Sequence, residues 1–180
     1  NVQSGKTGQM FGILCKAADL GFPAFLILTT DNVVLQAQTL ERVKSDLEGF
    51  CICGEDDTGL FVENSLLDPA IIILKKNNRI LRKWANTLNT TGFMKGNPLF
   101  IIDDEADAAS LNTFINRKGN QFSSINKYLN SIKNGATSSL YLQVTGTPQA
   151  ILLQTMASGW HPYFTYYFQP GSAYLGGDFF

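Results

Sequence analysis

The first ten residues, NVQSGKTGQM, contain a short segment whose residue types suit the binding of phosphate groups. Ser4-Gly5-Lys6-Thr7 matches the second half of a P-loop, G-x-x-x-x-G-K-[ST], whose opening glycine would fall one place before Asn1. In such a loop Gly5 lets the backbone approach phosphate, Lys6 places a positive charge on the β- and γ-phosphates, and the Thr7 hydroxyl binds Mg²⁺. The N-terminus of the helix that follows also attracts the anion. Taken alone, the motif is equally compatible with an ordinary surface loop.

A second segment places carboxylates at the end of an apolar run. Leu99–Ile102 is followed by DDEAD at positions 103–107, and strand ends of this kind are where α/β sheets bind ligands. For phosphoryl transfer to water, we assign Asp104 to the magnesium shell and Glu105 to orienting and deprotonating the water. Four acids in five residues repel one another, so a cation or a basic neighbour is required. The alternative interpretation is an acidic loop or a helix start.

A third segment, Thr145-Gly146-Thr147-Pro148, directly follows the apolar run Leu140–Val144. A turn rich in hydroxyl groups at a strand end can sense a γ-phosphate and relay its loss to a moving partner domain. Glycine and proline are also ordinary turn residues, so the motif by itself is more typical of a plain turn.

These three segments need a scaffold that brings them together, and the sequence predicts one. Apolar runs alternate with longer amphipathic segments, which is typical of a mostly parallel sheet with helices on both faces. The runs predict strands at Ala24–Thr29, Ala70–Leu74, Leu99–Ile102 and Leu140–Val144. Helices are predicted after Lys6 and over residues 32–47, 77–88 and 123–133. We therefore expect a single α/β domain over residues 1–180, because this length suits one ordinary domain.

Composition and charge exclude several classes of protein. Hydrophobic residues make up 44% and charged residues 16%, which argues against disorder and coiled coil. The net charge of −1 gives no global basic field for nucleic acid or an anionic membrane, although a local basic groove is still compatible with it. Three cysteines favour a reduced, cytoplasmic setting over a disulfide framework. No apolar stretch reaches the roughly 18 residues of a membrane helix, so we expect no membrane partner.

Other residues with chemical potential have simpler interpretations. Cys51-x-Cys53 lacks a second ligand pair at zinc spacing, so we reject a zinc site. His161 and the two tryptophans, Trp84 and Trp160, are more typical of core or rim packing than of substrate contacts. The densest basic cluster either faces a phosphate backbone or, as we favour, forms a solvated helix face; it comprises Lys75, Lys76, Arg79, Arg82 and Lys83.

Taken in order, the three motifs resemble those of the first RecA-like lobe of a superfamily-two helicase or translocase. The segment SGKT resembles motif I, DEAD at 104–107 spells the DEAD box, and TGTP at 145–148 resembles motif III. The residues QSGKT, IIDDEAD, VTGTPQA and the tail PGSAYLGGDFF are also similar to the Z-one domain, a helicase-like P-loop ATPase module of bacterial restriction-linked proteins.

The resemblance implies ATP and Mg²⁺ as ligands, with DNA as a partner. It implies that Asp104 and Thr7 hold the metal, that Lys6 and Glu105 are catalytic, and that Thr145, Gly146 and Thr147 couple hydrolysis to movement. The nucleotide-binding residues would be Gln3, Ser4, Gly5, Lys6 and Thr7. Thr29-Thr30 with Gln36 loosely resembles motif Ia, which contacts the nucleic-acid backbone in this superfamily.

The sequence departs from the helicase pattern in two respects. Asp103 stands where helicases usually have an apolar residue, and the chain ends before a second RecA-like lobe with its arginine finger. Loss of such a finger lowers the rate by about 10³–10⁵. In ATPases of the resembled class, the strand that leads into the P-loop is central and lies beside the strand that ends in the Thr145 motif; the resemblance places that strand upstream of Asn1. We therefore expect a fragment that borrows a strand from another copy or holds its P-loop poorly.

Three hypotheses follow for the function. The leading one is an ATP-hydrolysing lobe that acts on DNA in a restriction or defence endonuclease, together with a second RecA-like lobe and a possible nuclease domain. The second is a P-loop regulatory ATPase or switch that binds a protein partner without translocating. The third is an interaction fragment whose acidic cluster is a solvated loop.

Overall fold

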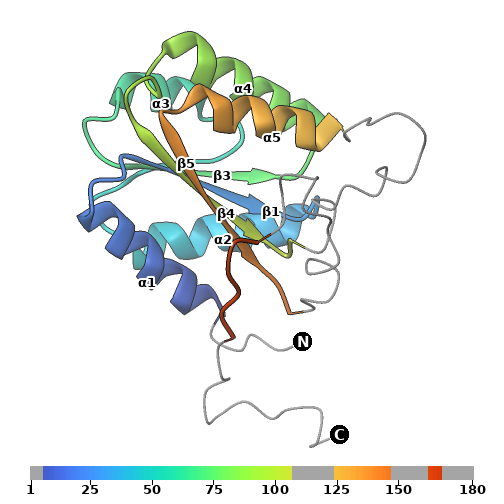
Figure 1. Ribbon diagram of the computed structural model, residues 1–180. Helices are drawn as coiled ribbons and strands as arrows, with labels where there is room; N and C mark the ends of the chain where they lie inside the picture. The colour runs from blue at the N-terminus through green and yellow to red at the C-terminus, as the bar shows by residue number, and fades with distance from the viewer. Residues whose placement is uncertain (1–5, 107–123, 147–161, 168–180) are drawn as a thin grey trace, which may run out of the picture.

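The computed structural model describes residues 6–106, 124–146 and 162–167. Helices and strands alternate along these ranges in the order α1, β1, α2, β2, α3, β3, α4, β4, α5, β5 (Figure 1). The helices are α1 (Lys6–Asp19), α2 (Val33–Asp46), α3 (Thr58–Asn64), α4 (Asn78–Thr91) and α5 (Ser124–Gly135). The strands are β1 (Ala24–Thr29), β2 (Cys51–Cys53), β3 (Ala70–Lys75), β4 (Pro98–Asp104) and β5 (Ser138–Val144).

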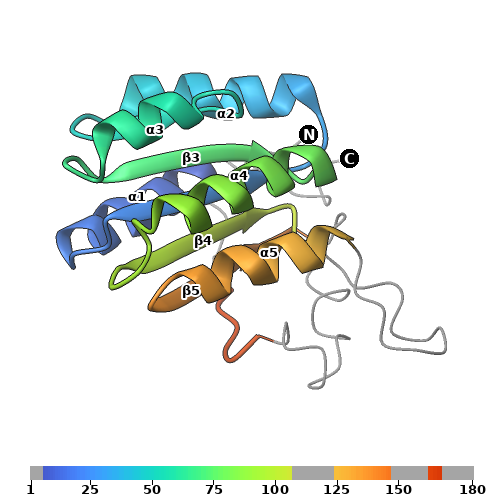
Figure 2. The ribbon, with the colours of Figure 1, turned by 90° about the horizontal axis from the view of Figure 1, so that it is seen from above.

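The strands form one five-stranded sheet in the order β2-β3-β1-β4-β5, with every neighbouring pair parallel. Helices α1 and α2 cover one face, and α3, α4 and α5 cover the other (Figures 1 and 2). The predicted α/β class, a parallel sheet with helices on both faces, is therefore confirmed.

The central strands are buried on both faces, which explains their almost continuous apolar sequences. All six residues of β1 are buried, and each face of the strand meets a different set of helices. Ala24, Leu26 and Leu28 pack in the core under α3, α4 and α5, whereas Phe25 and Ile27 pack in the core under α1 and α2. The sheet thus separates two apolar cores.

Local sequence explains where the helices begin and end. Asn32 and Asn77 precede α2 and α4, and the side chain of each accepts hydrogen bonds from the first backbone N–H groups of its helix. Gly92 follows α4 with φ 68°, a left-handed conformation that glycine adopts without strain. These caps place the starts of α2 and α4 at the carboxyl ends of β1 and β3.

The predicted elements match the observed ones closely, apart from two omissions. The predicted strand Ala24–Thr29 is identical to β1, and the other three strands are each longer than predicted. Strand β2 and helix α3 were not predicted, because β2 has three residues and α3 has seven, too few for a periodic pattern. Trp84 is fully buried in the core, as the packing interpretation predicts.

Strand β5 differs from the other long strands in its exposure. Its residues are half-buried or exposed, whereas β1 is wholly buried. In the part of the chain that the structure describes, β5 pairs with β4 alone and forms one margin of the sheet. Among the same residues, no helix has the length and apolar character needed to cross a membrane.

Candidate active site

The start of α1 brings Lys6 to the acidic end of β4. Helix α1 packs on the sheet through Met10, Phe11 and Leu14, and this packing fixes the direction from which Lys6 approaches. The Lys6 Nζ atom lies 3.2 Å from Glu105 Oε1 and 3.6 Å from Asp104 Oδ1. The predicted phosphate-binding lysine and the two predicted acids therefore meet, although 99 positions separate Lys6 from Glu105.

Side-chain alternation along β4 sends its two final aspartates to opposite faces of the sheet. Asp103 continues the series Leu99 and Ile101, which face α4 and α5, and it is fully buried. Asp104 continues the series Phe100 and Ile102 on the face of α1, where Lys6 lies. The two adjacent carboxylates thus have different lysine partners and different environments.

Glu105 follows β4 in the left-handed region, with φ 55°. Residues with a side chain rarely adopt this conformation, and such strain gathers at functional sites. The turn places the Glu105 side chain beside Lys6 with half of its surface exposed, so water reaches the carboxylate. That access suits a group that deprotonates water.

The pKa of Asp104 is raised above its ordinary value, chiefly because burial removes the carboxylate from water. Lys6 lowers the pKa, and the neighbouring Glu105 raises it. The ion pairs of Lys6 are partly exposed, so each contributes at most about 1 kcal/mol to stability. The charged form of Asp104 is therefore disfavoured here, and acids with a perturbed pKa are typical of functional sites.

The oxygen ligands at this point fit Mg²⁺. Carboxylate and hydroxyl oxygens are the protein ligands that Mg²⁺ prefers, and it usually takes only one or two carboxylates together with substrate phosphates. Asp104 supplies a carboxylate, and Thr7 lies half-buried in the first turn of α1, next to Lys6. Among residues 6–106, 124–146 and 162–167, no group of three or more histidines, cysteines and acids forms a metal cage.

The buried partner of Asp103 is Lys76, which sequence analysis did not place at the site. Lys76 Nζ lies 2.8 Å from Asp103 Oδ1, and both side chains are fully buried. Tyr141 donates its hydroxyl to the other oxygen, Asp103 Oδ2, at 2.6 Å. The repulsion among the four acids predicted a basic neighbour, and the structure supplies two, Lys6 and Lys76.

The favoured interpretation of the basic cluster as a solvated helix face holds for Arg79, Arg82 and Lys83, which are exposed on α4, but not for Lys75 and Lys76, which precede that helix. Lys76 is buried, and the neighbouring Lys75 pairs with Glu55 at 3.7 Å. Lys83 pairs with Asp56 at 2.9 Å. Glu55 and Asp56 lie in the loop between β2 and α3, and they pair with Lys75 and Lys83. The sequence did not predict this loop.

The predicted coupling segment begins beside the acids. Val144 is the register partner of Asp104, and the backbone N–H of Ala106 donates to the Val144 carbonyl at 3.0 Å. Thr145, which is half-buried, therefore follows β5 next to Glu105, and Gly146 is exposed. This placement suits a segment that responds to events at Glu105.

Several predicted residues lie outside the described part of the chain. They are Gln3, Ser4, Gly5, Asp107, Thr147, Trp160 and His161.

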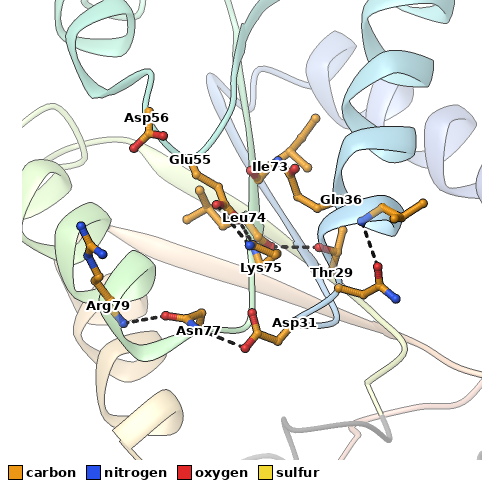
Figure 3. A network of polar contacts seen from close by, with 12 residues as sticks. Thr29, Asp31, Gln36, Glu55, Asp56, Ile73, Leu74, Lys75, Asn77 and Arg79 are labelled. Carbon is orange, nitrogen blue, oxygen red and sulfur yellow. Dashed lines mark hydrogen bonds and ion pairs between the residues drawn. The ribbon is translucent and has the colours of Figure 1, made fainter.

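The ends of β1 and β3 carry a separate polar network (Figure 3). Asn77, which caps α4, donates to Asp31 at 3.2 Å, and the Lys75 backbone N–H donates to Glu55 at 3.1 Å. Thr29 and Gln36, which resemble motif Ia residues, are buried, and their side chains donate to carbonyls of β3. These two side chains are therefore occupied inside the fold rather than presented to a nucleic-acid backbone.

Comparisons of the chain with protein-family models, with curated proteins and with solved structures find no match.

Proposed function

We propose that this chain binds and hydrolyses ATP as one lobe of a helicase- or translocase-like module that acts on DNA. The observation that carries the proposal is the meeting of Lys6 with Asp104 and Glu105 at the carboxyl end of a parallel sheet. A helix start, a lysine and two acids at this edge are the parts that phosphoryl transfer to water requires.

Each side chain at the site has a proposed role that follows from its chemistry. Lys6 attracts the β- and γ-phosphates, and Gln3, Ser4 and Gly5 complete the proposed phosphate-binding loop with Thr7. Asp104 and Thr7 would hold Mg²⁺, which when bound neutralises charge on the phosphates. Glu105 orients the attacking water and accepts its proton. Thr145, Gly146 and Thr147 form the proposed coupling segment.

The wider setting rests on the resemblance to the Z-one domain. It implies a second RecA-like lobe that supplies the arginine finger, and a restriction or defence endonuclease as the parent protein. Without that finger we expect little hydrolysis from the isolated chain. The three cysteines are all unpaired, which supports a cytoplasmic setting.

One observation favours the second candidate, a regulatory ATPase or switch that binds a protein partner. Lys75, Lys76 and Lys83 are engaged with acids, so most of the densest basic cluster is not free for DNA phosphates. Arg79, Arg82 and Lys83 are exposed, and of these three Lys83 is paired with Asp56. The site itself is the same under both candidates, and only the coupling partner differs.

The test is ATP hydrolysis by the full-length protein, with and without duplex DNA, at low and moderate salt. Strong stimulation by DNA that fades as salt rises supports the DNA-acting lobe, because backbone binding releases counterions. A rate of ATP hydrolysis that does not change when DNA is added supports the regulatory ATPase.

A matched pair of lysine variants links the activity to this site. Lys6→Ala should abolish nucleotide binding and hydrolysis, whereas Lys16→Ala, on the exposed side of the same helix, should retain both. Normal hydrolysis by Lys6→Ala would overturn the proposal.

A further inference from the structure

Lys76 uses its whole hydrogen-bonding capacity on the acidic end of β4. Its ammonium donates to Asp103 Oδ1 at 2.8 Å, to the Asp104 carbonyl at 3.0 Å and to the Glu105 carbonyl at 2.8 Å. An ammonium group has three protons, so each has its own acceptor. These acceptors belong to three consecutive residues, and the last two carry the proposed catalytic carboxylates.

The backbone of Lys76 also binds the end of a second strand, β1. Its N–H donates to the Thr29 carbonyl at 2.9 Å, where β1 ends. Strand β1 lies between β3 and β4, so Lys76 reaches from the end of β3 across β1 to the end of β4. One residue thereby fixes the relative positions of three strand ends.

Stability alone is a poor explanation for this arrangement. A buried ion pair is often no more stabilising than two well-packed apolar side chains, because both charges lose their water. Lys76 also donates hydrogen bonds to the backbone carbonyls of Asp104 and Glu105, which an apolar side chain cannot do.

One of these two hydrogen bonds is made to a residue whose backbone is strained. Glu105 has φ 55°, and its carbonyl is one of the two that Lys76 binds. Without a donor at that point the turn can relax toward ordinary backbone angles, and the Glu105 carboxylate would leave Lys6. The lysine therefore controls where the carboxylate points without touching it.

We propose that Lys76 is a positioning residue, which holds the Asp104–Glu105 backbone so that both carboxylates face Lys6 and the attacking water. This inference rests on the proposed ATP hydrolysis. A merely structural Lys76 would affect stability alone, whereas a positioning Lys76 affects the catalytic step at unchanged stability.

The deciding variant is the double substitution Lys76→Met with Asp103→Leu, studied in the full-length protein. Replacing both charges leaves neither buried without a partner, and Tyr141, which loses its hydrogen bond to Asp103, is only half-buried, so the thermal midpoint should stay near that of the wild type. Nucleotide affinity, measured with a fluorescent ATP analogue, should be unchanged because Lys6 is intact. The value of kcat should fall by about 10²-fold, the effect of small misplacement of a catalytic group.

Lys75→Met is the matched control. Lys75 is the preceding residue and also pairs with an acid, Glu55, but it makes no contact with Asp104 or Glu105 among the described interactions. Its kcat should stay at the wild-type value. Wild-type kcat in the folded double variant would overturn the inference. If the double variant does not fold, Lys76→Gln takes its place, because glutamine can still donate to Asp103. Wild-type kcat in folded Lys76→Gln would likewise overturn the inference.

A second measurement separates this inference from the proposed function. Amide hydrogen exchange over residues 104–106 should accelerate in the double variant and not in Lys75→Met, whether or not the protein hydrolyses ATP. If wild-type protein hydrolyses no ATP while exchange accelerates, the proposed function fails and Lys76 still fixes this backbone. Unchanged exchange at these residues contradicts the inference directly.

Discussion

Asp104 sits in an environment that disfavours its own charge. Burial raises its pKa, and neither of its charged neighbours removes that effect, since Lys6 and Glu105 act in opposite directions. A folded-state pKa above the unfolded value means that the folded protein holds this proton more tightly. The stability due to this group is then fully present below the ordinary aspartate pKa of about 3.9 and is lost as pH rises through the raised value.

Asp104→Asn removes that ionisation and should therefore stabilise the fold. We expect a higher thermal midpoint than wild type at pH 7 and no difference near pH 3, where the wild-type carboxyl is protonated. Asp68→Asn, at an exposed aspartate, is the control and should show no such trend. A stability gain that is the same at both pH values would contradict the assignment of the effect to the Asp104 charge.

Glu105→Gln tests the proposed general base with almost no change in shape. Loss of the proton acceptor should slow ATP hydrolysis by the full-length protein by about 10²–10⁴-fold. Nucleotide affinity should be retained, since Lys6 is unaltered. Glu63→Gln, at an exposed glutamate on α3, serves as the control. Unchanged turnover in Glu105→Gln would show that Glu105 is not the general base.

At the scale of elements, the sequence was informative where apolar residues form long runs. Strands β1, β3, β4 and β5 were predictable because each contains a run of apolar residues, and the acids were predictable because they follow one of these runs directly. Contacts from a distant turn, such as that of Lys76 with Asp103, depend on strand order. The order β2-β3-β1-β4-β5 is not encoded in any local pattern, so this lysine could not be assigned to the acids in advance.

Helix α4 offers a test of the core on its own side of the sheet. Trp84 is fully buried, stacks edge-on against Phe61 at 5.8 Å between ring centroids, and donates Nε1–H to the Glu55 carbonyl at 2.9 Å. Trp84→Ala should lower the free energy of unfolding by about 3–5 kcal/mol in urea titrations. Trp84→Phe should cost less, because an aromatic ring remains.

Leu67→Ala is the control for the Trp84 variants, because Leu67 is 86% exposed. It should leave the free energy of unfolding unchanged. Equal losses for Leu67→Ala and Trp84→Ala would mean that Trp84 does not anchor this core.

At the scale of the whole molecule, the two margins that the sheet has among the described residues are unlike each other. Strand β2 at one margin has three residues, which gives little backbone for further pairing. Strand β5 at the other margin has seven residues and carries Leu140, which is 49% exposed. Long margin strands with apolar side chains pair readily with other chains.

We therefore expect the 180-residue chain to self-associate through β5. Leu140→Lys should reduce the association, since lysine on an outer strand opposes pairing. Sedimentation velocity over a range of protein concentrations measures the effect. Leu20→Lys, at an exposed leucine beyond α1, is the control and should leave association unchanged. A wild-type chain that stays monomeric throughout would contradict the prediction.

The opposite facing of Asp103 and Asp104 makes the number of residues in β4 as consequential as their identity. Deletion of Ile102 would draw the acids back by one position and turn each to the other face. Asp103 would then replace Ile102 in the apolar core under α1 and α2, Asp104 would meet Lys76, and Glu105 would become the last residue of the strand instead of the left-handed turn. Natural variants that keep this site should exchange one apolar residue of β4 for another, yet tolerate neither an insertion nor a deletion there.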